Sequence, residues 1–374
     1  MKIVLLHNEI KPFRLPLFNY LNSIYDVKIY CLRSNKLTEN NIKDVEYGRY
    51  IRIPKMQDLE IPLDLWFFLK NEKPDVIIST DLGYAITYIG YLYSRVNQCK
   101  FVLWNEQWSD ILHPRRYLTK PLERLICRKA DKILSFGYKH AEYLIQLGAK
   151  ENNISIVPNA VPDFYPLSKI HNENNEFFNI PWIHDVTKIK IVCPGRLVKF
   201  KGHETILNSA VGIIKANKNA RFIFAGSGPE FGQLQQMVNK LGLNDYVFIT
   251  GVTFNEEMKN ALLINADLVI LASVKSKKIR AVEAWGLVVN EAIQYKKKII
   301  VSDATGVANE LIIDNETGGV FENGNHIDLQ NKILSCINHP EQWNIYAEKA
   351  YEKLITDYSM DVLIKKITFA LEEI

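Results

Sequence analysis

Cysteine is scarce in this sequence, and its five residues are too scattered for a disulfide framework or a thiolate metal site. They include no C-x-x-C pair, so a reducing compartment is the expected environment. Long apolar runs are absent too, since no stretch reaches the ~18 uninterrupted apolar residues of a membrane span. The first ten residues also lack the cleavage site of a signal peptide. We therefore expect a cytoplasmic protein.

An excess of charge of one sign is also missing, because 46 Lys and Arg stand against 42 Asp and Glu, a net charge of +4. That balance is too weak for a dedicated nucleic-acid binder, and we expect no nucleic-acid partner. A hydrophobic fraction of 47% and a charged fraction of 24% exclude a disordered or fibrous chain. The 374 residues are too many for one core and suit two domains.

Short apolar runs alternate with segments of helical period along the whole chain. This alternation predicts an α/β protein with two doubly wound parallel sheets, each covered by helices on both faces. A polar segment without period, His171–Asn179, predicts a linker between domains at residues 1–170 and 180–358. The apolar spacing in 361–374 predicts a final packed helix. The strands are expected at Lys2–His7, Val27–Cys31, Asp75–Thr80, Phe101–Trp104 and Lys132–Ser135, and then at Ile189–Cys193, Arg221–Ala225, Tyr246–Thr250, Leu268–Ala272 and Lys298–Ser302.

Polar groups gather where strands of the second domain end, the edge at which open α/β sheets bind ligands. Gly195 and Arg196 follow one strand, with Lys201 a few residues on, and two long cations there can converge on a diphosphate. Gly226 and Gly228 follow the next strand and open toward a helix N-terminus, which attracts anions. A solvated basic loop and an ordinary tight turn are the alternatives.

Two carboxylates, Glu283 and Glu291, bracket seven residues that include Gly286. Carboxylates in such a place can accept hydrogen bonds from the vicinal hydroxyls of a sugar and of a ribose. The alternative is that Glu291 only favours the dipole of the helix that starts there, with Glu283 in solvent.

In this order, the motifs resemble those of the family 4 glycosyltransferases with the two-domain GT-B fold. The family's G-R-L-x-x-x-K-G matches Gly195–Gly202, its G-x-G-P-E matches Gly226–Glu230, and its E-x-F-G-x-x-x-x-E matches Glu283–Glu291 with Trp285 for Phe. Further likeness lies in 157–162 (VPNAVP), and in 302–312. The resemblance implies two Rossmann-like domains facing a central cleft.

The resemblance also implies a function, retaining transfer of a sugar from a nucleotide-sugar such as a UDP- or GDP-sugar to a glycan or lipid-linked acceptor. Bacterial surface-polysaccharide synthesis is the expected setting. Arg196 and Lys201 would bind the diphosphate, Glu283 the donor sugar, and Glu291 the ribose. Backbone around Gly195, Gly226, Gly228, Gly286, Leu287 and Val288 would approach the nucleotide. No Asp-x-Asp occurs, so we expect neither a metal nor another cofactor.

The chain departs from the family pattern in three places. The first strand is followed by His7-Asn8-Glu9 without a glycine-rich loop, and a basic segment, 273–282, precedes Glu283. Many members place a histidine after a mid-domain strand, facing the donor sugar. Here Asn105 and Glu106 occupy that place, and we predict that one of them, with Glu106 preferred as a catalytic residue, faces the sugar.

Arg116, Lys120, Arg124 and Arg128 recur every four residues. On a helix they would form one stripe suited to an anionic membrane surface, and the chain would then be a peripheral membrane protein. A solvated helix face is the alternative. The rival functions are a non-catalytic sugar-nucleotide-binding protein and a GT-B sugar-nucleotide epimerase. A nicotinamide dehydrogenase is disfavoured because no G-x-G-x-x-G follows the first strand.

Overall fold

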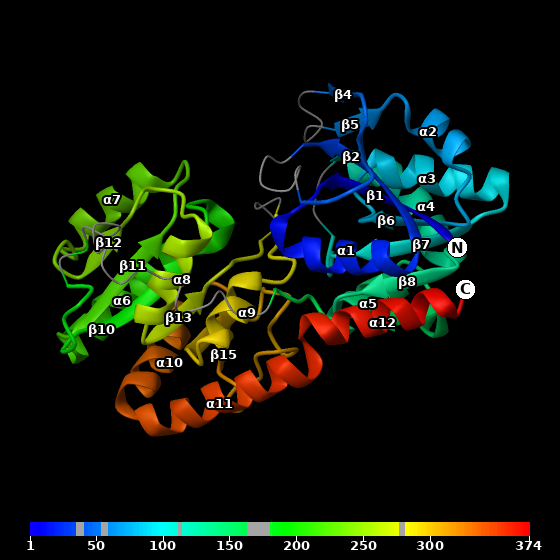
Figure 1. The fold of residues 1–374 in the computed structure, drawn as a ribbon. Coiled ribbons are helices and arrows are strands. Elements are labelled where there is room, and N and C mark those ends of the chain that lie inside the picture. The colour runs from blue at the N-terminus through cyan, green and yellow to red at the C-terminus, as the bar shows by residue number, and fades with distance from the viewer. Residues whose placement is uncertain (35–40, 54–58, 111–113, 163–179, 181, 277–280) are drawn as a thin grey trace. The chain divides into compact units, whose positions relative to one another are not determined.

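The computed structural model describes all residues except 35–40, 54–58, 111–113, 163–179, 181 and 277–280. The chain divides into two compact units, each with its own parallel sheet (Figure 1). Unit 1 comprises Met1–Pro162 and Tyr358–Ile374, and unit 2 comprises Asp163–Asp357. The predicted linker, His171–Asn179, lies outside the described residues.

Unit 1 is built on a seven-stranded parallel sheet of order β3-β2-β1-β6-β7-β8-β9. The strands are β1 (Lys2–Glu9), β2 (Asp26–Arg33), β3 (Val45–Tyr47), β6 (Val76–Thr80), β7 (Lys100–Asn105), β8 (Lys132–Ser135) and β9 (Ile154–Ile156). Chain order reverses between β1 and β6, which pair directly with Leu5 beside Ile78. This reversal opens a crevice at the carboxyl ends of the two strands, the usual ligand position in such sheets.

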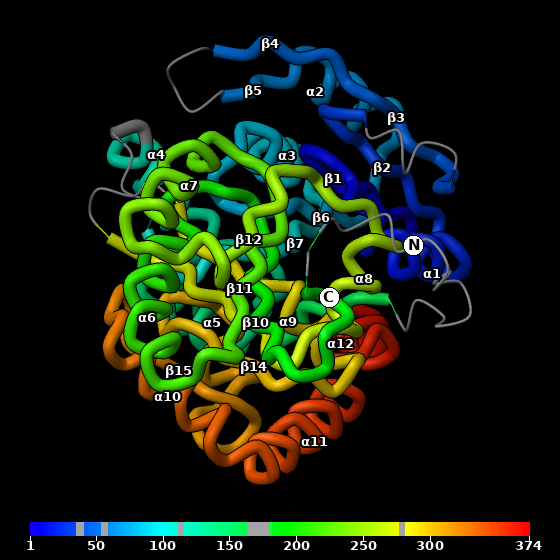
Figure 2. Tube along the Cα trace, turned by 90° about the vertical axis from the view of Figure 1, so that its left-hand side faces the viewer, coloured from blue at the N-terminus to red at the C-terminus, as the bar shows by residue number. Residues whose placement is uncertain are grey.

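Helices cover both faces of this sheet, because strands buried on two sides need apolar partners on each. The helices are α1 (Leu15–Ile24), α2 (Leu65–Glu72), α3 (Ala85–Asn97), α4 (Pro114–Lys129), α5 (Tyr138–Gln146) and α12 (Met360–Glu372). The C-terminal α12 packs against α1, β8 and β9 of unit 1, and Lys132 forms an ion pair with Glu373 just beyond it. A separate antiparallel hairpin, β4 (Tyr50–Ile53) and β5 (Leu59–Pro62), lies near α2 in Figure 2.

Unit 2 repeats the design with a six-stranded parallel sheet of order β12-β11-β10-β13-β14-β15. Its strands are β10 (Ile189–Pro194), β11 (Ala220–Ala225), β12 (Val247–Ile249), β13 (Leu268–Leu271), β14 (Lys298–Ser302) and β15 (Gly319–Phe321). Its helices are α6 (His203–Ala216), α7 (Phe231–Lys240), α8 (Glu256–Asn265), α9 (Leu287–Gln294), α10 (His326–Asn338) and α11 (Pro340–Asp357). Here the order reverses between β10 and β13.

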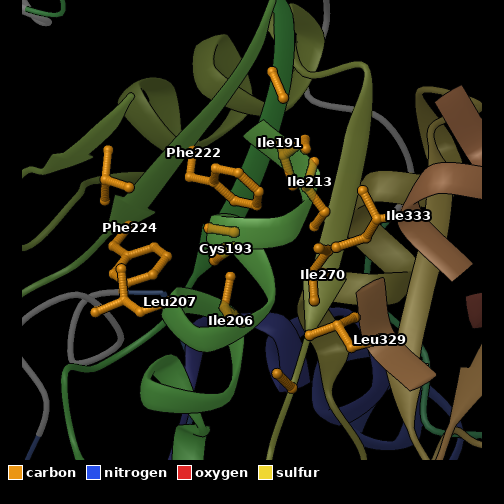
Figure 3. Close-up of a cluster of buried hydrophobic side chains, with 14 of the residues drawn as sticks. Ile191, Cys193, Ile206, Leu207, Ile213, Phe222, Phe224, Ile270, Leu329 and Ile333 are labelled. Atoms are coloured by element: carbon orange, nitrogen blue, oxygen red, sulfur yellow. The ribbon is translucent and has the colours of Figure 1, made fainter. Parts of the chain in front are cut away.

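The core of unit 2 shows why these runs form strands. Ile191 and Cys193 of β10 and Phe222 and Phe224 of β11 alternate along their strands and are buried on one face. Residues from α6 and α10 pack against that face, as Figure 3 shows. This packing buries one face of the sheet. The polar loops lie at its carboxyl edge. The predicted fold class, α/β with two doubly wound parallel sheets, is confirmed.

Candidate functional site

The loops after β10 and β11 are locked together by glycine. The amide of Gly195, whose φ is +144°, donates to the carbonyl of Ala225 at 3.0 Å. A Cβ on Gly226 would stand 2.0 Å from the Gly195 carbonyl oxygen, and one on Gly228 would stand 2.4 Å from that of Leu197. Any side chain at these positions would push the loops apart, so glycine is required for the close approach.

The side chains of Arg196 and Lys201, both in the segment after β10, lie near the same aromatic ring. Their cationic groups lie 5.9 and 5.5 Å from the centroid of Phe200. Arg196 is exposed and has no ion-pair partner in the part of the chain that the structure describes. Gly202, at φ +69°, then starts α6, and a Cβ there would stand 1.9 Å from the Ala272 carbonyl. The two cations therefore stand at the reversal between β10 and β13.

Lys201 and Glu283 are brought together although 82 residues separate them. The Lys201 ammonium donates to the Glu283 carboxylate, and Ser273, just after β13, donates to the same carboxylate at 2.8 Å. Both side chains of the ion pair are 14% exposed. Backbone pairing of Glu283 with Thr305 fixes its position. Part of the predicted basic segment, 277–280, lies outside the described residues.

Gly286 ends the next turn and caps α9. Its φ of +111° suits glycine, and a Cβ would meet Leu271 at 2.3 Å. Trp285, which replaces the family's phenylalanine, is 2% exposed. Its indole N–H donates to Asn290 at 2.9 Å. These contacts place the first amides of α9, those of Leu287 and Val288, at the end of β13, where a helix N-terminus can hold an anion.

Glu291 lies one turn further along α9 and is paired with a lysine that belongs to none of the sequence motifs. Lys259 of α8 donates to Glu291 at 2.6 Å and lies 2.8 Å from a carboxylate oxygen of Glu256. Burial raises the pKa of Glu291, and the charge of Lys259 opposes that rise. Burial lowers the pKa of Lys259, but the two carboxylates outweigh it and raise the value overall. No motif pointed to Lys259, which is 32 residues away in sequence.

Glu106 stands in unit 1, at the end of β7, and is not one of the unit 2 residues described above. Its carboxylate accepts from the buried Arg14 at 2.8 Å, and its amide donates to Asp81 at 2.8 Å. Asn105, the other candidate, is fully buried and donates to the Gln107 carbonyl at 2.6 Å. Glu106 is therefore the member of the pair that lines a cavity, together with Arg14 and Asp81.

The predicted cationic stripe on α4 is wrong at Arg116. This guanidinium is 6% exposed and donates to Glu123 and Gln107, each at 2.5 Å. It turns inward because Glu123, at 0% exposure, needs a charged partner. Lys120 pairs with Asp110, whereas Arg124 and Arg128 are exposed.

No group of three or more His, Cys, Asp or Glu side chains that could hold a metal ion occurs among the described residues. Within the same residues, no helix is long and apolar enough to cross a bilayer.

Two family profiles match the chain, one for each unit. The "Glycosyltransferase Family 4" profile matches residues 19–163, and the "Glycosyl transferases group 1" profile matches residues 175–353. The chain belongs to the family 4 glycosyltransferases. As a member, it shares the GT-B fold of its structural neighbours. Anabaena HepE, solved with UDP and glucose, covers 100% of both chains at a TM-score of 0.78 and 19% identity. A Rickettsia africae glycosyltransferase has a TM-score of 0.78 at 16% identity and covers 100% of this chain and 98% of its own.

Curated relatives of this family 4 member differ in the share of their length that aligns. Alpha-D-kanosaminyltransferase of Streptomyces kanamyceticus is 27% identical over 44% of this chain and 41% of its own. Poly(ribitol-phosphate) alpha-N-acetylglucosaminyltransferase of Staphylococcus aureus is 24% identical over 61% and 45%. The chain thus spans less than half the length of these two relatives. An uncharacterized glycosyltransferase of Methanocaldococcus jannaschii is 21% identical over 91% of this chain and 88% of its own.

Proposed function

We propose that the chain transfers a sugar from a nucleotide-sugar to the hydroxyl group of a glycan or lipid-linked glycan, with retention at the anomeric carbon. The observation that carries this proposal is the convergence of Lys201, Ser273 and Glu283 beside the N-terminus of α9. Cations, sugar-binding carboxylates and a helix N-terminus at one reversal point suit a nucleotide-sugar.

The donor would bind to the charged side chains that form ion pairs with one another in unit 2. Its diphosphate would bind Arg196, Lys201 and the first amides of α9. Its sugar hydroxyls would donate to Glu283, and its ribose hydroxyls would donate to Glu291. Lys201 and Lys259 each have a carboxylate partner in the structure, so the site stays near neutral until the donor enters.

The chemistry follows from these charges. The bond between the anomeric carbon and the phosphate oxygen breaks through an oxocarbenium-like transition state, and negative charge grows on the departing phosphate. Arg196 and Lys201 would stabilise that charge more than the ground state, which is the condition for catalysis. The acceptor oxygen bonds to the same face of the sugar, and its proton passes to a phosphate oxygen of the leaving group. Because two cations would face the diphosphate, we expect transfer without a metal ion.

A UDP-sugar is the first donor to test, because structural neighbours contain UDP, UDP and glucose, or UDP-glucose. The names of two relatives specify alpha linkages, the product expected when an α-linked donor reacts with retention. Polysaccharide or glycolipid synthesis is supported by the S. aureus relative, which acts on a poly(ribitol-phosphate) by its name.

The exposed face of α4 supports peripheral binding to an anionic membrane at which a lipid-linked acceptor would be reached. Tyr117, Leu118 and Leu125 are 77%, 81% and 44% exposed, beside the exposed Arg124 and Arg128. Exposed apolar side chains next to cations are typical of helices that lie in the membrane interface.

Thermal unfolding with UDP, GDP, ADP and TDP tests the donor site, since a nucleotide that binds the folded state raises Tm. The preferred nucleotide is then supplied as its sugar conjugates, and transfer to glycan acceptors is followed by mass spectrometry. The anomeric configuration of the product is read by NMR. Binding without any transfer would favour a non-catalytic sugar-nucleotide-binding protein, and isomerised nucleotide-sugar would favour an epimerase.

A further inference from the structure

Helices α2, α3 and α4 lie side by side on one face of the unit 1 sheet (Figure 1). Their inner sides share one buried core with the strands. Helix α2 contacts α3, and Tyr88 of α3 donates to Glu123 of α4 at 3.3 Å. Their outer sides form one surface, which we call the three-helix face. It is made mainly by Phe67, Leu92, Val96, Leu118, Arg124 and Lys129.

The sequence of α3 does not suit a helix whose outer side meets only water. Of its 13 residues, only Arg95 is charged. Leu92 and Val96 are one turn apart and are 57% and 63% exposed, and Ile89, one turn earlier, is partly exposed. A surface helix of a soluble domain carries charged and polar residues on that side. The exposed side of α3 is instead apolar over about two turns.

The neighbouring helices extend this apolar surface on both sides of α3. Phe67 of α2 is 67% exposed. On α4, Leu118 and Leu125 are seven residues apart and therefore lie on the same side of the helix, and both are exposed. Single exposed apolar residues are common, but a surface that gathers them from three adjacent helices indicates a binding partner.

The charges around these apolar side chains are almost all positive. The three helices contain eight Lys and Arg and only two Glu. Glu72 forms a 2.7 Å ion pair with Lys2, and Glu123 is buried. Arg124 and Lys129 are exposed and form no ion pair among the described residues. The three-helix face therefore presents free cations, while its own carboxylates are paired or buried.

An anionic bilayer matches both properties of this face. Its phosphates attract cations, and the acyl chains just below them accept apolar side chains. A second copy of the chain fits worse, because a twofold contact would set Arg124 and Lys129 close to the same cations of the other copy. A nucleic acid would place its phosphates against the apolar side chains. No helix among the described residues is long and apolar enough to cross a bilayer, so the expected contact is with one leaflet.

We propose that the three-helix face docks on an anionic lipid surface, with Phe67, Leu92 and Val96 in the membrane interface and the cations at the lipid phosphates. This goes beyond a contact by α4 alone, because α2 and α3 supply apolar side chains that the spacing of the arginines does not indicate. The inference rests on the proposed function only in its use, which is to bring the enzyme to a lipid-linked acceptor.

Vesicle sedimentation with the full chain tests the contribution of α3. The vesicles contain phosphatidylcholine alone or an equal mixture of phosphatidylcholine and phosphatidylglycerol. Leu92→Ser with Val96→Ser removes two exposed apolar side chains, so the fold should survive. We expect this variant to bind the anionic vesicles about tenfold more weakly, by the same factor at low and high salt, because apolar burial is not screened by ions.

A matched control exists on α11 of unit 2. Ile345 and Ile355 are each 50% exposed, and Ile345→Ser with Ile355→Ser should bind vesicles as the wild type does. The same comparison can be made with a polarity-sensitive dye attached at Leu92→Cys or Ile345→Cys. Cys99, the only cysteine that is not buried, is first replaced by serine. With anionic vesicles, emission from position 92 should shift to shorter wavelength and be quenched by nitroxides on the lipid chains, whereas position 345 should show neither effect.

The proposal is overturned if the wild type binds no anionic vesicles, if the α3 serine variant binds them as the wild type does, or if the dye at position 92 stays in water while the chain is bound. Light scattering without lipid examines the second copy. A wild-type dimer that becomes a monomer in the α3 serine variant would assign the face to that copy and also overturn the proposal.

Vesicle binding needs neither donor nor acceptor, so this inference and the proposed function can fail separately. A chain that binds vesicles through α3 but transfers no sugar would keep the membrane face and lose the proposed function. A chain that transfers sugar but binds no anionic vesicles would do the reverse.

Discussion

The Lys259 ammonium on α8 donates to the Glu291 carboxylate on α9 at 2.6 Å. The pair joins two helices of unit 2, and Lys259 opposes the rise in the pKa of the half-buried Glu291 carboxyl that burial causes. A charged carboxylate accepts hydrogen bonds at both oxygens, whereas a protonated one donates at one of them. In the proposed function, Lys259 would therefore favour the form of Glu291 that accepts hydrogen bonds from the ribose hydroxyls.

Lys259→Met should weaken nucleotide binding in a pH-dependent way. Without the lysine, burial alone acts on Glu291 and raises its pKa further, so more of the carboxyl is protonated near neutral pH. We expect the Kd for the preferred nucleotide to rise about tenfold at pH 6.5, the loss of roughly one charge-assisted hydrogen bond, and to recover toward pH 9. Calorimetric titration at several pH values measures this. Lys240→Met, at an exposed position of α7, is the control, and a pH-independent loss in Lys259→Met would contradict the mechanism.

Lys201→Ala should reduce kcat about 10²–10³-fold, the range for loss of one group that stabilises charge in a transition state. The Kd of the donor should change less, because in the proposed reaction the charge on the leaving phosphate grows only as the bond to the sugar breaks. Glu283 keeps its 2.8 Å hydrogen bond from Ser273, so the fold should survive. Lys215→Ala, on the exposed side of α6, serves as the control. Single-turnover rates at saturating donor measure the effect on the chemical step. An unchanged rate would mean that Lys201 has no catalytic role.

Asp81→Asn should make unit 1 more stable at pH 8 and leave it unchanged at pH 4. Burial and the nearby Glu106 raise the pKa of Asp81 from its ordinary 3.8 to about 7. Between these values the unfolded state loses the proton that the folded state keeps, so this group reduces stability as pH rises, with the full cost present above pH 7.

Asparagine removes that ionisation in Asp81→Asn. It also tolerates the φ of +60° at this position. The difference in unfolding free energy between variant and wild type should grow by up to about 1.4 kcal/mol per pH unit. Denaturant titrations from pH 4 to pH 8 measure this difference. The lowered pKa of His7 changes stability in the opposite direction, but it acts equally on variant and wild type and therefore cancels. A constant difference across this range would mean that Asp81 has an ordinary pKa.

The sequence predicted the sheets well because their central strands are continuous apolar runs. It missed the short strands β3, β9 and β15 at or near the sheet edges and the hairpin strands β4 and β5, because these runs gain their pairing from neighbouring strands that the sequence does not identify. The motif residues Lys201 and Glu283 were predicted individually. Their ion pair was not, because it depends on Gly202 lying against the end of β13.

The contact between Arg14 and Glu106 could not be predicted from the sequence. Arg14 and Glu106 are 92 residues apart, and neither belongs to a motif that reports the other. Only the adjacency of β1, β6 and β7 brings them together. The prediction for Arg116 was wrong for a related reason. Its four-residue spacing matches the exposed Arg124 and Arg128, but the buried Glu123, about two turns away, pairs with it inside unit 1.

Membrane binding by α4 should therefore depend on fewer residues than the cationic spacing suggests. Arg124→Gln with Arg128→Gln removes two exposed cations, each contributing about 1 kcal/mol near an anionic surface. Leu118→Ser with Leu125→Ser removes the exposed apolar contacts. Each double variant should sediment less with vesicles that contain anionic phospholipid, and only the arginine variant should lose the salt dependence. Arg116→Gln is a different case, because it leaves the buried Glu123 without its charged partner and should destabilise the fold by about 3–5 kcal/mol. Transfer to a short water-soluble acceptor should persist in both double variants. Vesicle binding equal to wild type in both would mean that this face of α4 is only solvated.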